Sequence, residues 1–419
     1  MSYVGDYSNG GTNSDRGLIR IDGTLGGADG YEQTTCKEIT LTESLLTPGL
    51  QTSATFQSQI YGNRTFKNWD ATKQQNMNLQ MSDQLASQTQ GEFGRQMSVN
   101  QTIYRLDNRE FQPTNVSNVE EMTFHACDNT LLEDSKTLVS KGWKCTTPDQ
   151  IVSYVLTSCV GAQNPDVQSC NPTRDYVAEL IHPFQVVAQC ANMALDGEDP
   201  SFIHYMTYGN GSQWIPTHHF RSLKYLSSQS IKKTFEFSTS GTRGKQGYND
   251  PSNLNQAIHF MFPCDYDLLS DLLNGVGAGG QNINALMTMN PFNAQGSFLN
   301  GNMQACVKNG NLKISMTNKD TAQKKGGCES DVEKYLLRRQ ARMGLLEKDK
   351  VALRLVVHWT PSLHAGDVIY FRWKDKYNGS ELYGSGSYLI SSMTHRVQMG
   401  GYSTTTLDCV STTVGQGIV

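Results

Sequence analysis

Apolar and polar residues alternate along most of the first 115 residues, which is the pattern of half-buried β-strands. The clearest runs are LIRIDGTL from Leu18, CKEITLTESLLTPGLQTSATFQSQI from Cys36 and MSVNQTIYRLDNREFQP from Met97. Proline and glycine at positions 48 and 49 interrupt the second run and indicate a turn. We therefore predict a first β domain over residues 17–118. The Gly-, Ser-, Asn- and Asp-rich residues 1–16 are expected to form a flexible arm.

The pattern changes between residues 119 and 228, where apolar residues recur at helical spacing. TTPDQIVSYVLTSCVG predicts a helix with Thr147 as its cap and Pro148 at its first position. The apolar face of this helix contains Ile151, Val152, Val155 and Leu156. HPFQVVAQCANMAL (residues 182–195) predicts a second helix, with Phe184, Val187, Cys190, Ala191 and Ala194 on one stripe. Because SFIHYMTY and HHFRSLKYL look like strands, residues 119–228 are predicted to be an α+β domain.

Strand-like alternation returns at residues 229–247 (IKKTFEFSTS) and again from Val351 to the end of the sequence. Between them, DVEKYLLRRQARMGLL (residues 331–346) has the clearest helical periodicity in the chain. We predict a second β domain made of residues 229–247 and 331–419, with this helix leading into it. Residues 248–330, rich in Asn, Gly, Gln and Met, are predicted to be an insertion with a short helix at DYDLLSDLLNG. The similar texture of the two β domains is compatible with two related barrels.

The last two strands are predicted to form a hairpin. A three-residue loop, Met399-Gly400-Gly401, sets Met393 opposite Leu407 and Ser391 opposite Cys409, whereas a two-residue loop would mix the faces. The apolar face then closes a small barrel, with Leu389, Met393, Val397, Leu407 and Cys409 in its core. The other face is polar and comprises Ser392, Thr394, Arg396, Gln398, Tyr402, Thr404, Thr406 and Asp408.

Composition supports a large β-rich protein. A chain of 419 residues exceeds the size of a single core, so two or more domains are expected. Only 18% of residues are charged and 37% are hydrophobic, and the remainder is largely Gly, Ser, Thr, Asn and Gln. The net charge of −4 argues against a protein that binds nucleic acid by neutralising phosphates. No apolar run approaches the length of a membrane span, and the first residues lack a secretion signal, so we expect a protein that folds in a cytoplasm.

Catalytic, cofactor and metal motifs are not found in this sequence. The GVGAGG segment at 275–280 matches a dinucleotide-binding pattern, but a helix-like segment precedes it where a strand is required. His218 and His219 are adjacent on a strand and would point to opposite faces, which disfavours a shared metal. The ten cysteines contain no Cys-x-x-Cys pair, so mostly free thiols are expected. We therefore predict no catalytic residue, cofactor or metal site.

Two stretches resemble the baseplate hub proteins of contractile-tailed bacteriophages. The first is residues 119–226, where a VSK segment, a Pro-x-x-Ile-Val helix, a His-Pro-Phe helix and an Asp-Pro-x-Phe strand precede His-Phe-Arg-Ser-Leu. The second is residues 331–412, where a helix that contains Tyr and Arg leads into LHAGDVI and a final Gly-Gly-Tyr-x-Thr. Tail late-control proteins and the hub portion of the type VI secretion spike look similar in the second stretch. Together the two stretches cover nearly half of the chain.

The resemblance implies a structural, non-enzymatic homotrimer in which each chain supplies two related β-barrel tube domains. Three chains would form a pseudo-sixfold ring between the hexameric tail tube and the central spike, in contact with other baseplate proteins. Phage DNA would pass through its lumen without specific binding, and the polar hairpin face would border that channel or meet the next subunit. The protein would then belong to the tail baseplate of the virion and be assembled in the host bacterial cytoplasm. The alternatives are the hub of a related type VI-like injection machine and a tail-associated peptidoglycan hydrolase.

Overall fold

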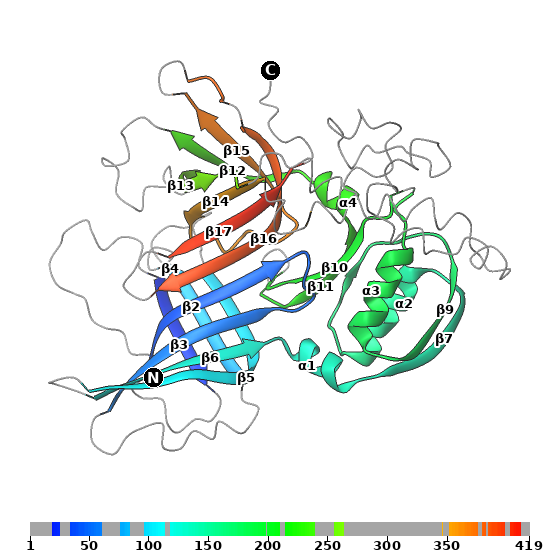
Figure 1. Cartoon of the computed structure of the whole chain (residues 1–419), viewed down its shortest axis with the longest axis horizontal. Coiled ribbons are helices and arrows are strands. Elements are labelled where there is room, and N and C mark those ends of the chain that lie inside the picture. The colour runs from blue at the N-terminus through cyan, green and yellow to red at the C-terminus, as the bar shows by residue number, and fades with distance from the viewer. Residues whose placement is uncertain are drawn as a thin grey trace, which may run out of the picture.

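The computed structural model describes residues 19–25, 34–60, 76–83, 96–113, 118–197, 199–209, 214–238, 255–263, 346, 352–375, 379–382, 384–398 and 403–411. Within them the chain is mainly β, as the alternating pattern predicts, and a smaller α+β part packs beside a twelve-stranded sheet (Figure 1). The arm expected at residues 1–16 and the helix expected at residues 331–346, except Leu346, lie outside the described residues. The same is true of the short helix expected in DYDLLSDLLNG.

The first half of the large sheet contains six antiparallel strands in the order β1-β4-β5-β6-β3-β2. Successive side chains point to opposite faces of a strand, so the alternating sequence separates an apolar face from a polar one. Ile39, Leu41 and Phe124 on the apolar face are completely buried. The strands are β1 (Ile19–Leu25), β2 (Thr34–Ser44), β3 (Gln51–Ile60), β4 (Asn76–Asp83), β5 (Gln96–Pro113) and β6 (Asn118–Cys127).

The second half of the sheet is built around β16, which pairs with β17 on one side and β15 on the other. From β17 the pairing continues to β14 and β13, and from β15 it continues to β12. An isolated bridge between Glu236 of β12 and Gln256, just before β13, links the two outer strands of this half. The strand pairings of this half therefore form a closed circuit. The strands are β12 (Ile231–Ser238), β13 (Ala257–Met261), β14 (Leu353–His358), β15 (Val368–Lys374), β16 (Gly386–Gln398) and β17 (Thr404–Val410).

The two halves are joined into one sheet by the antiparallel pair β2–β16. Residues 38–44 of β2 lie opposite residues 392–398 of β16, with Thr40 opposite Arg396. Figure 1 shows the two strands side by side at the middle of the molecule, although they come from opposite ends of the sequence. A polar side chain that continues a row on one half therefore faces the same side as its neighbours on the other half.

A β-bulge in β16 marks the point where its neighbour changes. Ile390 lies opposite Cys409 and Ser392 lies opposite Asp408, so Ser391 is the extra residue. Before the bulge β16 pairs with β15, and after it with β2. The predicted pairing of Met393 with Leu407 is confirmed. The predicted pairing of Ser391 with Cys409 is wrong because the bulge moves Ile390 into that position. The predicted loop and Tyr402 lie outside the described residues.

The α+β part follows β6. Both predicted helices form, and the four apolar residues expected on one face of the first are completely buried. HHFRSLKYL was expected to be a strand throughout, but the Ser222 side chain accepts a hydrogen bond from Tyr225 N and starts α4. The helical elements are α1 (Asn129–Lys136), α2 (Pro148–Tyr154), continued by a π-helical turn (Val155–Cys159), α3 (Pro183–Met193) and α4 (Leu223–Ser227). The strands are β7 (Val139–Thr146), β8 (Asp166–Val167), β9 (Arg174–Ile181), β10 (Phe202–Thr207) and β11 (Thr217–Ser222).

Two segments belong to different parts of the fold from those expected. The sequence after residue 118 was assigned to the α+β domain, but β6 pairs along its length with β3 and β5 of the large sheet. Residues 248–330 were assigned to an insertion, but β13 pairs with β14 and buries Ala257. Each of these strands is a short apolar–polar alternation next to a point where the composition of the sequence changes. Local sequence therefore does not assign it to a domain, and its pairing with distant strands does.

Candidate functional site

A continuous polar face runs across both halves of the large sheet. One register row crosses seven strands, from β14 to β5, and each of its members is opposite the next. All of its side chains are half-exposed or exposed. The row consists of His358, Thr404, Arg396, Thr40, Ser53, His125 and Arg105. Neighbouring rows add mainly Thr, Ser, Asn and Gln, so the face is hydrophilic but carries few charges.

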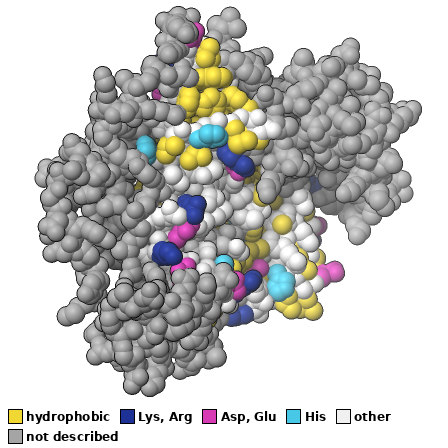
Figure 2. All heavy atoms as spheres, turned by 60° about the vertical axis from the view of Figure 1, so that its left-hand side comes forward, with side chains coloured by type: hydrophobic (Ala, Val, Ile, Leu, Met, Phe, Trp, Pro, Cys, Tyr) yellow, Lys and Arg dark blue, Asp and Glu magenta, His cyan; other side chains and the backbone are white. Residues whose placement is uncertain are grey.

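The charged side chains of this face are matched one to one. Among the residues of β5, β6, β3, β2, β16, β17 and β14 whose side chains the structure describes, the face has four Lys or Arg and four Asp or Glu, and each cation contacts one of these carboxylates. The closest N–O distances are 2.8, 2.9, 2.6 and 2.5 Å for Lys37–Glu121, Arg105–Asp107, Arg354–Asp408 and Arg396–Glu38. Figure 2 shows basic and acidic side chains next to one another within a mostly white surface.

The ion pairs also shift the pKa values of their members. The hydrogen bond from Arg396 lowers the pKa of Glu38, and the one from Arg105 lowers the pKa of Asp107. The hydrogen bonds to Asp408 and Glu38 raise the pKa of Arg354 and Arg396, respectively. All four groups therefore keep their charges over a wide pH range, and the face is balanced at neutral pH.

A β-bulge brings one of these cations onto the polar face. In β2, Cys36 lies opposite Phe56 and Glu38 lies opposite Thr55, so Lys37 is the extra residue. Cys36 is buried, whereas Lys37 and Glu38 are both accessible to solvent. Strict alternation would have turned one of these two charged residues into the core, so the bulge allows both to reach carboxylate or guanidinium partners on neighbouring strands.

The structure places the predicted hairpin residues as follows. Within the described part of the polar set, all seven side chains are half-exposed or exposed and face the side described above: Ser392, Thr394, Arg396, Gln398, Thr404, Thr406 and Asp408. The five residues predicted to share one core are buried, but they lie in three separate clusters. Met393, Leu407 and Cys409 pack in the second half, Val397 packs in the first half, and Leu389 packs near α4. The bulge at Ser391 and the joint with β2 cause this division, because β16 passes from one core to the other.

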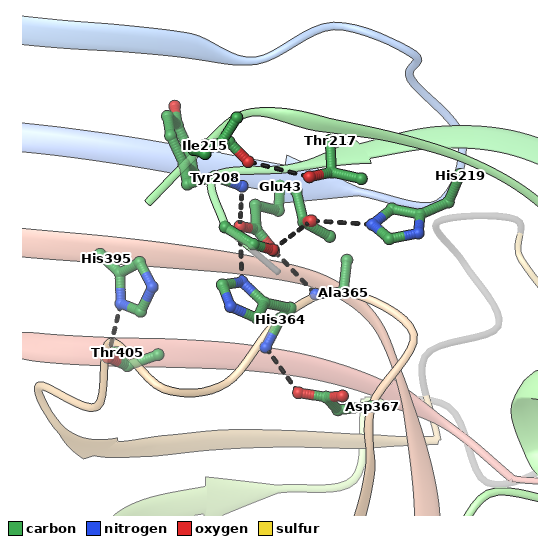
Figure 3. Close-up of polar contacts among 12 residues, drawn as sticks. Glu43, Tyr208, Ile215, Thr217, His219, His364, Ala365, Asp367, His395 and Thr405 are labelled. Atoms are coloured by element: carbon green, nitrogen blue, oxygen red, sulfur yellow. Dashed lines mark hydrogen bonds and ion pairs between the residues drawn. The ribbon is translucent and has the colours of Figure 1, made fainter. Parts of the chain in front are cut away.

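On the opposite face of β2, a buried carboxylate connects three parts of the chain. Glu43 is 1% exposed and accepts hydrogen bonds from the Tyr208 and Ala365 N–H groups, both at 2.8 Å. Its Oε1 also accepts a bond from His364 Nδ1 at 3.1 Å. Figure 3 shows Glu43 between the end of β10 and the loop that connects β14 to β15. The carboxylate thus joins the α+β part to both halves of the sheet.

The charges of this buried pair stabilise each other. Burial alone would raise the pKa of Glu43, but the charge and hydrogen bond of His364 together with the two N–H groups outweigh it and lower this pKa. Burial alone would lower the pKa of His364, but the charge and hydrogen bond of Glu43 outweigh it and raise this pKa. The pair is therefore ionised in the folded protein near neutral pH.

A polar cavity of about 400 Å³ lies between the α+β part and the β14–β15 loop. It contains an arrangement that resembles a catalytic triad: Thr207 Oγ1 is 2.9 Å from His219 Nε2, and His219 Nδ1 is 2.7 Å from Asp166 Oδ2. The Thr207 hydroxyl also lies 2.7 Å from the carbonyl oxygen of Gly209, a second acceptor for its proton. Arg221 also contacts the carboxylate of Asp166. Since the Asp166 carboxylate accepts from His219 Nδ1, the Nε2 lone pair of the neutral imidazole faces the Thr207 hydroxyl, and Gly209 and His219 share that hydroxyl proton in a network at the cavity wall.

The adjacent histidines point to opposite faces of β11, as the sequence predicts. His218 contacts His204 and Thr130, with N–N and N–O distances of 3.0 Å, whereas His219 faces the cavity. Within the described ranges, no group of three or more His, Cys, Asp or Glu side chains is arranged to hold a metal ion. Across the same residues, no helix is long and apolar enough to cross a membrane.

Most of the described cysteines are free, as their spacing predicts, and Cys145 is disulfide-bonded. Burial raises the pKa of all six free thiols, to about 11 for Cys127 and about 12 for Cys190. Thiols with such pKa values are poor nucleophiles at neutral pH. The free cysteines are Cys36, Cys127, Cys159, Cys170, Cys190 and Cys409.

The fold is shared with a protein described as a tail protein. The tail protein from Neisseria meningitidis MC58 has a TM-score of 0.50 and 10% sequence identity, over 94% of this chain and 97% of that one. The 43 kDa tail protein of prophage MuSo2 from Shewanella oneidensis has a TM-score of 0.47 and 10% identity, over 94% and 98% of the two chains. The Escherichia coli c3393 protein, a component of the type VI secretion system with structural similarity to the T4 tail proteins gp27 and gp5, has a TM-score of 0.49 and 9% identity, over 95% and 79%.

No protein-family model and no curated protein matches the sequence. The resemblance to tail proteins indicated by the sequence is confirmed as a shared fold with the Neisseria tail protein.

The sequence analysis missed two features of the site. The ion pairs of the polar face link strands that are distant in the sequence, so their partners are not apparent from spacing. Glu43 left a local signal, because it occupies an inward position between Leu41 and Leu45, where an apolar residue is expected. An acidic residue at such a position indicates a buried ion pair even when its partner is unknown.

Proposed function

We propose that this chain is the structural baseplate hub of a contractile phage tail. In this proposal three copies form a pseudo-sixfold ring that joins a hexameric tail tube to a central spike. The two halves of the large sheet act as two related β-barrel tube domains, so that three chains present six of them. The polar sheet face lines the lumen through which DNA passes. The protein belongs to the virion baseplate, is assembled in the host cytoplasm, and contacts tube, spike and other baseplate proteins.

The observation that carries the proposal is the polar row that crosses seven strands and both halves of the sheet. A sheet whose apolar face is covered and whose other face is polar and continuous suits the wall of a water-filled channel. The tail-protein fold supports the same role. The raised pKa values of the free thiols support a non-enzymatic function.

The first test is the mass of the purified chain, measured by native mass spectrometry alone and with its tube and spike proteins. Three copies of 46.5 kDa give a particle of about 140 kDa. A stable monomer that joins neither partner would overturn the proposal. Assembly is expected to bury further apolar surface, so the trimer should also melt at a higher temperature than the dilute chain.

The second test distinguishes a lumen from a subunit interface. Thr40→Cys places a thiol in the middle of the polar row, and its labelling is read as the increase over the unsubstituted chain, in which Cys159 is partly accessible. In the assembled particle, a small maleimide should label this cysteine and a polyethylene glycol maleimide larger than the channel should not. Labelling by both reagents contradicts a lumen, and protection from both indicates contact between subunits.

A further inference from the structure

The polar face holds four cationic side chains that could contact a polyanion if they had no acidic partners. Lys37, Arg396 and Arg354 lie on β2, β16 and β14, which are within a few strand spacings of one another in the sheet. Strands are about 4.8 Å apart, so such side chains lie within reach of successive phosphates of one duplex. Each unpaired Lys or Arg that contacts a phosphate releases counterions and adds to affinity without regard to base sequence.

Each of these cations instead contacts a carboxylate on the same face. Glu38 accepts from Arg396 Nε at 2.5 Å and from Gln398 Nε2 at 3.3 Å, so its two oxygens are both occupied. Asp408 accepts from Arg354 through both of its oxygens, at 2.6 and 3.1 Å. Lys37 Nζ donates to Glu121 at 2.8 Å, across β3. The hydrogen bonds direct the charged ends of the cations along the sheet surface towards the acids.

These pairs are only partly desolvated. Lys37 and Arg396 are 54% and 57% exposed, and Glu121 and Glu38 are 23% and 32% exposed. Ion pairs this accessible contribute little to stability, on the order of 0.2–1 kcal/mol each. Their regular one-to-one matching on one face therefore requires an explanation other than fold stability.

We propose that the four carboxylates mask the four cations of the polar face, so that duplex DNA passes along it without being held. That DNA is the polyanion in question rests on the function proposed above. The masking itself is a property of the free chain, which is where it is tested. Among the described side chains of this face, masking leaves no Lys or Arg without an acidic partner. The face therefore has the same net charge as a face made only of Thr and Ser.

The experiment is the binding of the purified chain to a duplex oligonucleotide, measured by fluorescence anisotropy between about 50 and about 200 mM salt. Glu38→Gln with Glu121→Gln leaves Arg396 and Lys37 unpaired on neighbouring strands. The native chain is expected not to retain the duplex. The double variant is expected to bind it, and two phosphate contacts predict that affinity falls roughly tenfold over this salt range.

A matched control adds the same charge elsewhere. Glu133→Gln with Glu179→Gln removes two solvent-accessible acids from α1 and β9, outside the polar face, and is expected not to create binding. Adding Lys37→Gln and Arg396→Gln to the first double variant is expected to abolish the binding it gained. Melting temperatures of all variants are measured alongside to verify that each is folded.

The proposal is overturned if the native chain binds the duplex as tightly as the double variant does. It is also overturned if the double variant gains no binding, or if the control pair gains as much. These outcomes are separate from failure of the hub proposal, which the mass and labelling measurements detect. A chain that is a monomer but whose variant gains binding would keep the masking and lose the hub role.

Discussion

His364 Nδ1 donates a hydrogen bond to Glu43 Oε1 at 3.1 Å, between two side chains that are 321 positions apart in the sequence and are 7% and 1% exposed. The same carboxylate accepts the N–H groups of Tyr208 and Ala365. Removing a buried carboxylate from water is costly, and the three donors together offset that cost. One acidic side chain thus connects the α+β part to both sheet halves by hydrogen bonds.

Glu43→Gln is expected to destabilise the protein by about 3–5 kcal/mol, because it leaves the charge of His364 buried without its partner. Glu38→Gln is the matched control, since this residue is on the opposite face of the same strand and is partly exposed. It is expected to cost less than about 1 kcal/mol. Urea unfolding of the two variants provides the comparison, and equal losses would contradict a special role for Glu43.

The contribution of the Glu43–His364 pair to the free energy of unfolding should fall at both high and low pH. The pKa of His364 is raised above its usual 6.5, so its contribution is complete below about 6.5 and is lost as the pH rises through the raised value. The pKa of Glu43 is lowered below 4.5, so its contribution is complete above about 4.5 and is lost as the pH falls through the lowered value. The free-energy difference between the native protein and Glu43→Gln should therefore be largest between these values. A difference that does not change from pH 4 to pH 9 would contradict an ionised pair.

Local alternation predicted the existence of most strands correctly, because a half-buried sheet imposes a period of two on its residues. Helix signals were equally informative where a cap and a proline coincided, as at Thr147 and Pro148. The sequence did not predict which strands are neighbours. Thr40 and Arg396 face each other across the joint, but β2 resembles several other strands in polarity, so nothing local identifies its partner.

The bulges explain the other errors. The extra residues Lys37 and Ser391 each break the alternation at one position, and the break depends on long-range pairing rather than on local propensity. The bulge at Ser391 therefore places Ile390 opposite Cys409 and separates Leu389 from Met393. Glu43 is the instructive case, since its conflict with an apolar stripe was visible in the sequence and marked the junction.

Two buried histidines should make the α+β part sensitive to acid. Burial lowers the pKa of His204 well below 6.5 and the pKa of His218 to about 3, so both are neutral in the fold. Unfolded histidine takes up a proton near pH 6.5, so stability is complete above that pH and is lost as the pH falls towards the lowered values. Each histidine should account for about 2 kcal/mol between pH 7 and pH 5.

His204→Gln keeps a polar group beside His218 and removes one of these titrations. The variant is expected to lose about 2 kcal/mol less than the native protein does on acidification from pH 7 to pH 5. His259→Gln, at an exposed position on β13, controls for the change in histidine number. Denaturant unfolding monitored at both pH values checks the slope, and the same acid sensitivity in all three proteins would exclude this origin.

A glycine in the second half of the sheet provides the last prediction. Gly384 has φ +91°, and a Cβ there would overlap Cζ of Phe262, whose ring packs near Trp373. Gly379 has φ +68°, but a Cβ added to it would meet no heavy atom within 4 Å. Gly379→Ala should cost about 1–2 kcal/mol, from the left-handed backbone alone.

Gly384→Ala should cost about 1–3 kcal/mol more than Gly379→Ala, because the aromatic ring must also move. The two variants share the backbone penalty, so the difference between their free energies of unfolding isolates the packing of Phe262 against the second half. In a Phe262→Ala background the ring is absent. There, Gly384→Ala should cost about as much free energy of unfolding as Gly379→Ala does. If Gly384→Ala were no more damaging than Gly379→Ala, residues 262 and 384 would not be in contact, and the closure of the second half through β13 would lose its support.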